Sequence, residues 1–159
     1  MIETAQESID IGAAYFVPDK MMLKALISAT ERGVTVRVIL PGKNNDQPAV
    51  THASRELWGD LLKAGVLIHR YRPSMFHCKI VIADRKLTSV GSANFDNRSF
   101  RLNDEMNLNV YDEDFAHKMT GIFEKDLEDC SLATYEEWQN RSFTTKLSDR
   151  FYRLFRRQR

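Results

Sequence analysis

Short β-branched runs that alternate with amphipathic segments constrain the fold of this chain more than any other feature. The run VTVRVIL (34–40) is apolar and β-branched, as expected of a buried strand. Segments with apolar residues at helical spacing lie on either side of it, over 20–32 and about 50–64. A further apolar run, VLIHRY, follows over 66–71. This alternation predicts an α/β fold, with a central mixed β-sheet flanked by helices on both faces of a single domain.

The same periodicities assign the rest of the chain. Asp84-Arg85-Lys86 separates two strand-like runs, HCKIVIAD and LTSVGSAN, and predicts a hairpin turn between them. The remaining strand expected from period-2 alternation is NDEMNLNVYD, over 103–112. The other expected elements are a helix over about 2–8, a strand over 9–16, a helix over 112–129 and a short helix over 131–139.

Polar side chains stand where the hairpin strands begin and end. Residues two apart on a strand share a face, about 6.6 Å apart at roughly 3.3 Å per residue. His77 and Lys79 therefore project together, and so do Ser92 and Asn94. If the two strands pair, all four groups meet at one edge of the sheet, and Glu105 on the next strand can reach the same place.

This set of groups suits a phosphate ester. A lysine, a hydroxyl and an amide (Lys79, Ser92 and Asn94) can hold the non-bridging oxygens while the imidazole of His77 attacks phosphorus. Glu105 can bind the second ring nitrogen of His77, which fixes the tautomer and stabilises the charged ring. Because lysine and amide groups supply the positive field, no metal and no cofactor are expected.

The spacing of these residues resembles a known motif. His77-x-Lys79 with four residues before Asp84, followed by Gly91-Ser92-x-Asn94, is similar to the HKD motif of the phospholipase D superfamily. The segments AYFVPD, FHCKIVIAD, GSANFDNRSF and NDEMNLNV look most like the C-terminal half of bacterial cardiolipin synthases. The resemblance covers about residues 2–140 and implies a phospholipase D-like domain.

The third residue of the motif, Asp84, has two interpretations. The resemblance places it with His77, Lys79 and Glu105 among the catalytic residues. Parity along the strand, however, puts it on the face opposite His77, at the hairpin turn. A turn-stabilising role through nearby backbone amides and a direct chemical role both stay open.

The chain departs from the family pattern in two respects. Ala13-Ala14 precede Tyr15-Phe16 where the family suggests a Thr-Pro pair. Full-length cardiolipin synthases also carry two HKD motifs and N-terminal membrane helices, whereas this sequence shows one motif and no run of about 18 apolar residues. In the family mechanism one histidine attacks phosphorus and a second protonates the leaving alcohol. The resemblance therefore implies a second HKD half, supplied by homodimerisation or by a separate N-terminal half.

Charge is unevenly distributed. The net charge is +1, yet residues 141–159 carry seven basic side chains against Asp149 alone. We therefore expect two parts, a domain over 2–140 and a basic amphipathic C-terminal tail over 141–159. An anionic membrane surface would match the tail, although a helix that caps the domain or a disordered tail fits equally well. The apolar stripe expected on the tail comprises Leu147, Phe151, Leu154 and Phe155.

The other reactive side chains give weaker signals. Cys78 and Cys130 are too few for a disulfide framework and fit a reduced, cytosolic domain. His52, His69 and His117 lack the spacing of metal ligands. Tyr15 and Phe16 are interpreted as strand packing, although the resemblance places their segment near the active site.

Three functions are consistent with these observations. The first is a cardiolipin synthase-like half-module that transfers a phosphatidyl group between two phosphatidylglycerols through phospho-His77, peripherally on the cytoplasmic side of the bacterial membrane. The second is a homodimeric phosphodiesterase or nuclease, which the acidic body of the chain disfavours because nucleic-acid binders usually show a basic face. The third is an inactive, truncated remnant that serves as a lipid- or protein-binding module.

Overall fold

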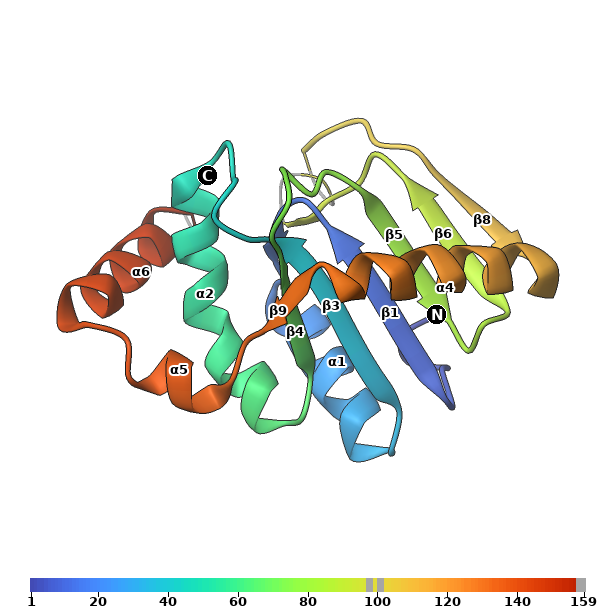
Figure 1. Cartoon of the computed structure of the whole chain (residues 1–159), viewed down its shortest axis with the longest axis horizontal. Coiled ribbons are helices and arrows are strands. Elements are labelled where there is room, and N and C mark those ends of the chain that lie inside the picture. Colours follow the sequence, from blue (N-terminus) through green and yellow to red (C-terminus); the bar gives the residue numbers. More distant parts are fainter. Residues whose placement is uncertain (97–98, 100–101, 157–159) are drawn as a thin grey trace.

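A mixed sheet forms the centre of the protein (Figure 1). The computed structural model describes residues 1–96, 99 and 102–156, with side chains described up to Tyr152. Within these residues the sheet has seven strands in the order β8-β6-β5-β1-β3-β4-β9. Its strands are β1 (Ser8–Ala13), β3 (Thr35–Pro41), β4 (Leu67–Tyr71), β5 (Lys79–Ala83), β6 (Leu87–Gly91), β8 (Asn107–Tyr111) and β9 (Cys130–Leu132).

Strand direction changes across the sheet. The three strands β1, β3 and β4 are parallel, as the helical crossovers between them require. On one side β5, β6 and β8 continue the sheet as antiparallel neighbours, and on the other side β9 pairs antiparallel with β4. Two further short strands, β2 (Phe16–Val17) and β7 (Phe95–Asp96), pair in parallel outside the main sheet. The predicted mixed α/β sheet is confirmed.

Helices cover both faces of the sheet. On one face Leu26, Trp58 and Leu61 pack with the strand residues Ile11 and Val38. On the other face α4 contributes Ala116 and Phe123, which pack with Ile39, Ile80 and Ile82, and Figure 1 shows α4 running across the near side of the sheet. The helices concerned are α1 (Lys20–Glu31), α2 (Pro48–Lys63) and α4 (Glu113–Glu128).

The sequence sets the ends of these helices. The carboxylate of Asp19 accepts a hydrogen bond from the Met22 amide, and that of Asp112 accepts one from Phe115, so each caps a helix N-terminus. Gly33, with φ of +88°, follows the last turn of α1, in a conformation that glycine adopts without steric cost.

A buried ion pair crosses the α4 face of the sheet. Asp10 on β1 is 1% exposed, and its carboxylate accepts from Nε and Nη2 of Arg37 on β3 at 2.6 and 2.8 Å. Hydrogen bonding to Asp10 raises the pKa of Arg37, against the opposing effect of burial. The Arg37 guanidinium also lies over the Phe123 ring of α4. Two neighbouring strands and a helix are thereby joined by one charged contact.

The C-terminal segment packs on α2. Two helices, α5 (Tyr135–Gln139) and α6 (Phe143–Arg156), follow β9, and Figure 1 shows them beside α2. Asp149 of α6 is fully buried, with Arg141 at 2.6 Å, His52 at 2.7 Å and Arg55 at 3.6 Å. Electrostatic contacts therefore attach α6 to α2, while the division into 2–140 and 141–159 stays a prediction. Across the described ranges, no helix is both long and apolar enough to cross a bilayer.

Three local expectations were wrong. The segment 2–8 forms turns before β1 and no helix, because its backbone N–H groups bond to the distant Asp84 carboxylate. The strand predicted over 103–112 is shorter, and spans 107–111. The helix predicted over 131–139 is divided into β9 and α5, because residues 130–132 pair with the exposed edge of β4. In the first and third cases a long-range contact outweighs local propensity.

Candidate active site at the open end of the β5–β6 hairpin

The hairpin brings the two halves of the predicted motif together. In the antiparallel register Ile80 lies opposite Val90, so the start of β5 lies beside the end of β6. Lys79 is also paired with Ala13 of β1. His77 and Lys79 thus lie at the same end of the sheet as Ser92, as the spacing predicted.

His77 is exposed, and an aromatic wall orients it. The ring of Tyr15 meets the imidazole edge to face, with centroids 6.0 Å apart and an interplanar angle of 85°. The Tyr15 hydroxyl donates to Asp46 at 2.8 Å and accepts from Gln47 at 3.3 Å, so the loop before α2 holds the tyrosine in place. The tyrosine interpreted from sequence as strand packing therefore forms one wall of the site.

Lys79 supplies a positive charge beside the imidazole. Its ammonium group donates to the carbonyl oxygen of His77 at 3.2 Å, and the side chain is partly exposed. The positive charge of Lys79 is also one of the causes that lower the pKa of Glu105 and so favour its ionised form. The ammonium group of Lys79 thus lies near both His77 and Glu105.

Ser92 joins the end of β6 to the segment before β8. Its hydroxyl accepts from the Met106 amide at 3.1 Å, and its amide donates to the Met106 carbonyl at 3.0 Å. A side chain at Gly91 would collide with Met106 and Asn107, so glycine is required for this close approach. The glycine at position 91 therefore contributes to the site by letting two backbone segments approach closely, in addition to the polar side chains.

Glu105 is held by hydroxyl and amide donors. Hydrogen bonds from Ser92 and Asn103 lower its pKa most, with further contributions from Ser99 and Lys79. Its carboxylate accepts from Ser99 at 3.1 Å and from Asn103 at 3.3 Å. The Ser92 hydroxyl also lies 3.5 Å from the Met106 carbonyl, but we assign its proton to Glu105, since a charged acceptor makes the stronger bond.

The expected contact between Glu105 and His77 is not among the hydrogen bonds of the described residues. Glu105 instead belongs to the network of Ser92, Ser99 and Asn103. Sequence reasoning missed Ser99 and Asn103, although both lie close to the motif in the chain. An orienting role for Glu105 in the assembled enzyme therefore stays a prediction.

Asn94 has incomplete hydrogen bonding. Its Oδ1 is buried, and none of the described residues donates to it. Side-chain amides are normally satisfied when buried, and exceptions need a structural or functional reason. Asn94 follows Ser92 at the same end of the hairpin, as expected, but nothing in its contacts fixes the direction of its amide.

Asp84 lies at the other end of β5. With φ of +53° it begins the hairpin turn, and its carboxylate accepts from the amides of Gln6, Glu7 and Ser8 at 2.8–3.1 Å. Burial raises its pKa, but these three bonds outweigh that effect and the net shift is downward. At roughly 3.3 Å per residue, seven residues separate Asp84 from His77 by about 20 Å. The structure therefore does not bring Asp84 to the other predicted catalytic groups.

The cysteines and metal-binding groups contribute little here. Cys78, between His77 and Lys79, points to the core, where burial raises the pKa of its thiol to about 12. Cys130 shows the same effect, with a pKa of about 11. Among the described residues, no three His, Cys, Asp or Glu side chains converge as metal ligands.

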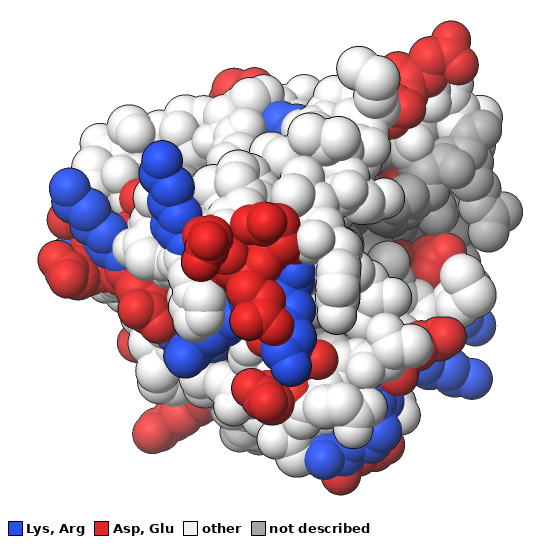
Figure 2. Space-filling view, turned by 90° about the vertical axis from the view of Figure 1, so that its right-hand side faces the viewer, with Lys and Arg blue, Asp and Glu red and all other residues white. Residues whose placement is uncertain are grey.

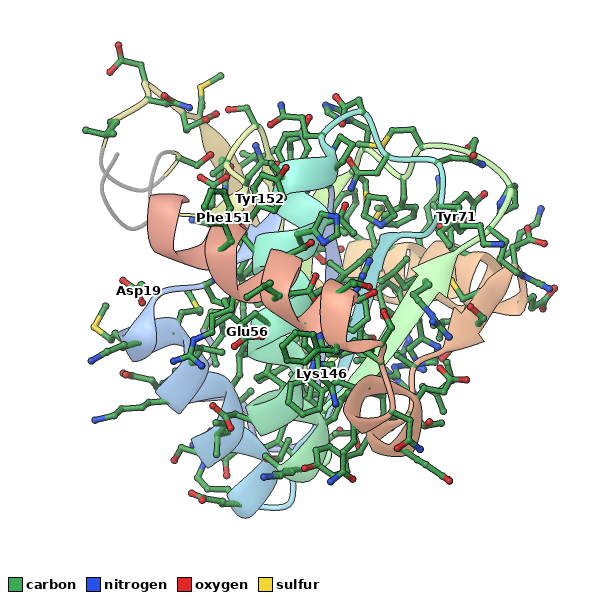
Figure 3. The ribbon with its side chains drawn as sticks, turned by 90° about the vertical axis from the view of Figure 1, so that its left-hand side faces the viewer. Asp19, Glu56, Tyr71, Lys146, Phe151 and Tyr152 are labelled. Carbon is green, nitrogen blue, oxygen red and sulfur yellow. The ribbon has the colours of Figure 1, made fainter. Side chains whose placement is uncertain are left out.

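The outer surface of α6 is apolar. Phe143, Leu147 and Phe151 follow one another at four-residue steps, and they are 80%, 60% and 53% exposed. Lys146 and Arg150 lie between them in the sequence, and Figure 3 shows α6 crossing α2 with Lys146, Phe151 and Tyr152 labelled. We call Phe143, Leu147 and Phe151 the apolar stripe. The other residues expected in it, Leu154 and Phe155, lie outside the described side chains.

Comparisons with known proteins find relatives over nearly the whole chain. The family described as "Cardiolipin synthase, PLD-like domain" matches residues 1–127. A cardiolipin synthase of Geobacillus kaustophilus is 40% identical over 154 residues, which is 97% of this chain and 30% of that protein. The chain thus spans about 30% of the length of the curated relatives that it matches most strongly.

Solved structures support the fold. Nuc of Salmonella typhimurium, a phospholipase D family member, superposes with a TM-score of 0.73 at 21% identity, covering 84% of this chain and 86% of that one. A phosphatidylserine synthase of Haemophilus influenzae gives a TM-score of 0.76 at 18% identity, over 95% of this chain and 40% of that one. At such identities the likeness concerns the fold alone.

Proposed function

Because the chain belongs to the family of cardiolipin synthase PLD-like domains, we propose that it forms one half of a phosphatidyltransferase site. The observation that carries this proposal is the meeting of His77, Lys79, Ser92 and the ionised Glu105 at one end of the β5–β6 hairpin. An exposed imidazole beside a cation and a hydroxyl is suited to attack on a phosphodiester.

The proposed reaction has two steps. In the first, a nitrogen of His77 bonds to the phosphorus of phosphatidylglycerol, the bond to glycerol breaks, and a second histidine gives its proton to the departing glycerol oxygen. In the second, that histidine takes the proton of a hydroxyl on another phosphatidylglycerol. The resulting oxygen attacks phosphorus and displaces His77, which gives cardiolipin.

Each neighbour of His77 has a role in this reaction. Lys79 and Ser92 neutralise and hold the non-bridging oxygens, with Asn94 as a further phosphate ligand. Glu105 balances the fixed charge of Lys79 and stabilises the positive charge that develops on the imidazole in the assembled site. Asp84 acts at a distance, by tying the N-terminal segment to the hairpin turn.

A second HKD half is required by the direction of the reaction. The attacking nitrogen and the leaving oxygen lie on opposite sides of phosphorus, so one imidazole cannot serve both. His77 is exposed, as a residue facing a second half must be. We therefore propose that another copy of this chain, or a separate N-terminal half, supplies the second histidine.

A peripheral position at the membrane forms part of the proposal. The apolar stripe of α6 is exposed with Lys146 and Arg150 nearby, the combination that favours an interfacial helix on anionic lipid. The cytoplasmic leaflet carries such lipid in many membranes. We place the protein on that side, with α6 toward the headgroups.

The side of the molecule shown in Figure 2 does not favour nucleic acid as a substrate. On the side of the molecule shown in Figure 2, Lys and Arg side chains interleave with Asp and Glu and form no continuous basic stripe. Backbone phosphates of DNA are bound through such stripes.

Activity with a second half present tests the proposal. The chain, alone and mixed with an N-terminal half of a relative, is incubated with phosphatidylglycerol vesicles, and cardiolipin and glycerol are measured. We expect both products in equal amounts, and their loss in His77→Asn. Cardiolipin formed equally well by His77→Asn would reject the role of His77, and DNA cleavage without lipid turnover would favour the nuclease.

A further inference from the structure

A cationic cleft lies outside the active site. Its volume is about 910 Å³, and it is bounded by the loop before α2, by α2 itself, by β4 and β9, and by the α5–α6 segment. Among the described residues that line it, the acid is Glu137. The basic residues along the wall are Lys43, His52, Arg55, Arg70, Arg72 and Arg141.

The positive charge of the cleft is only partly neutralised. Asp149 pairs with Arg141 and Arg55, and Glu137 pairs with Arg70 at 2.9 Å. Glu56 adds a weaker contact to Arg141 at 3.9 Å. Five fixed positive charges thus meet three carboxylates, which leaves an excess of cations in a concave surface.

Two of the basic residues have no carboxylate partner among the described residues. Arg72 donates to the backbone carbonyls of Asp129 and Glu128 at 2.9 and 3.3 Å, which leaves its charge uncompensated. Lys43 is exposed and pairs with none of the described residues. Arg70 and Arg141 each keep a buried Nε–H without an acceptor. The exposed cations of Lys43 and Arg72 are therefore the groups that an anion in the cleft can reach.

The cleft adjoins the active site. Tyr71 lines the cleft, and its ring lies 5.1 Å from that of Phe76, the residue before His77. On the other side, Asp46 of the loop before α2 binds Tyr15, whose ring contacts His77. Figure 3 shows this side of the molecule, with Tyr71 at the end of β4 and α6 crossing α2. The Tyr71–Phe76 contact and the Asp46–Tyr15–His77 contacts thus link the wall of the cleft to the surroundings of His77.

The cleft also adjoins the proposed membrane surface. Thr145 of α6 lines it, and the apolar stripe lies on the same helix. At 3.6 residues per turn, Thr145 lies about 160° around α6 from the centre of the apolar stripe. A phospholipid whose phosphate lies among the basic side chains would therefore pass its acyl chains around α6 to reach the bilayer. A free phosphate would use the cleft charges but not the stripe.

We propose that this cleft binds the phosphate of the second phospholipid, whose hydroxyl accepts the phosphatidyl group. The inference rests on the proposed function, and it assigns the acceptor lipid to a site separate from Lys79 and Ser92. The ligand chemistry is a phosphodiester that bears glycerol.

Binding of the deacylated headgroup tests this site without turnover. Glycerophosphoglycerol is titrated into the full chain carrying His77→Asn, and amide shifts and the Kd are measured by NMR. We expect shifts at cleft residues and saturable binding. The variant Lys43→Gln/Arg72→Gln should weaken it at least tenfold. The control Arg85→Gln/Lys86→Gln removes the same charge from the exposed hairpin turn and should change the Kd less than twofold.

Four results would overturn the inference. Equal weakening by the two double variants would indicate general attraction, and shifts confined to the surroundings of residue 77 would place the headgroup elsewhere. Inorganic phosphate bound as tightly as the headgroup, or a short oligonucleotide bound more tightly, would assign the cleft to another ligand. Failure of the proposed function is distinguishable, because it would remove cardiolipin formation while leaving headgroup binding intact.

Discussion

Replacing Asp84 by Asn separates a structural role of this residue from a chemical one. The Asp84 carboxylate accepts from Glu7 at 2.8 Å and Ser8 at 3.0 Å through Oδ1, and from Gln6 at 3.0 Å through Oδ2. The Gln6 amide donates to Oδ1 as well, at 3.1 Å, so an amide oxygen can keep three neutral bonds, and its NH₂ group loses the second contact to Gln6.

The cost can be estimated from these bonds. A hydrogen bond to a charged group contributes about 1.5–3 kcal/mol and a neutral one about 0.5–1.5 kcal/mol, so each of the three retained bonds loses about 1 kcal/mol. Because Asp84 is partly exposed, solvent screening reduces the sum to about 2 kcal/mol. For a chain of this length that lowers Tm by about 4–8 °C.

The pH dependence gives a second signature. The folded state lowers the pKa of Asp84 below its usual value of 3.8, so its stabilisation is present above that pH and is lost as the pH falls through the folded pKa. The difference in unfolding free energy between wild type and Asp84→Asn should therefore be constant near neutral pH and shrink in acid.

Urea denaturation from pH 2.5 to 7, with cardiolipin synthesis by the assembled enzyme at 20 °C, tests both points. Asp60→Asn, on the exposed surface of α2, is the matched control and should change stability by less than about 0.5 kcal/mol. Activity of Asp84→Asn should stay within threefold of wild type. A hundredfold loss of activity with unchanged stability would refute the structural assignment.

Three further predictions concern the rest of the structure. Asp149→Ala leaves Arg141, His52 and Arg55 without their buried partner and should cost about 3–5 kcal/mol in urea denaturation; a loss below 1 kcal/mol would show that α6 is not held by this contact. Asp10→Ala strands the half-buried Arg37 and should cost about 3 kcal/mol by the same measurement, whereas a neutral effect would contradict the importance of this ion pair. Leu147→Glu should weaken cosedimentation with anionic vesicles at least tenfold, since an inserted leucine contributes about 1.5–3 kcal/mol; an equal loss in the control Met21→Glu, on α1, would count against the apolar stripe.

Strand periodicity predicted most of the sheet and the meeting of the site residues. The register of the β5–β6 hairpin follows from two apolar runs and a three-residue turn, which is local information. Alternation of strands and helices likewise predicted a central mixed sheet, in which β1, β3 and β4 are parallel. These features follow from patterns within a few residues of one another.

Contacts between distant segments could not be predicted from those patterns. The segment before β1 forms turns because the backbone amides of residues 6–8 donate hydrogen bonds to the carboxylate of Asp84, which lies far along the chain. Asp149 looked like the one acid of a basic tail, but it is the buried partner of three basic groups. Tyr15 was interpreted as packing because nothing local shows that His77 lies beside it. Each of these contacts forms between elements that are distant in the sequence and become neighbours only in the folded structure.

Covalent capture at His77 tests the central claim most directly. The chain, with its second half present, is mixed with phosphatidylglycerol, quenched without acid within the first turnover, and digested for mass spectrometry of the peptide that contains His77. The account predicts a phosphatidyl group on the His77 ring within the first turnover, and its amount should fall as cardiolipin accumulates. Full cardiolipin synthesis with the label on another residue, or with no protein-bound label at any time, would contradict it.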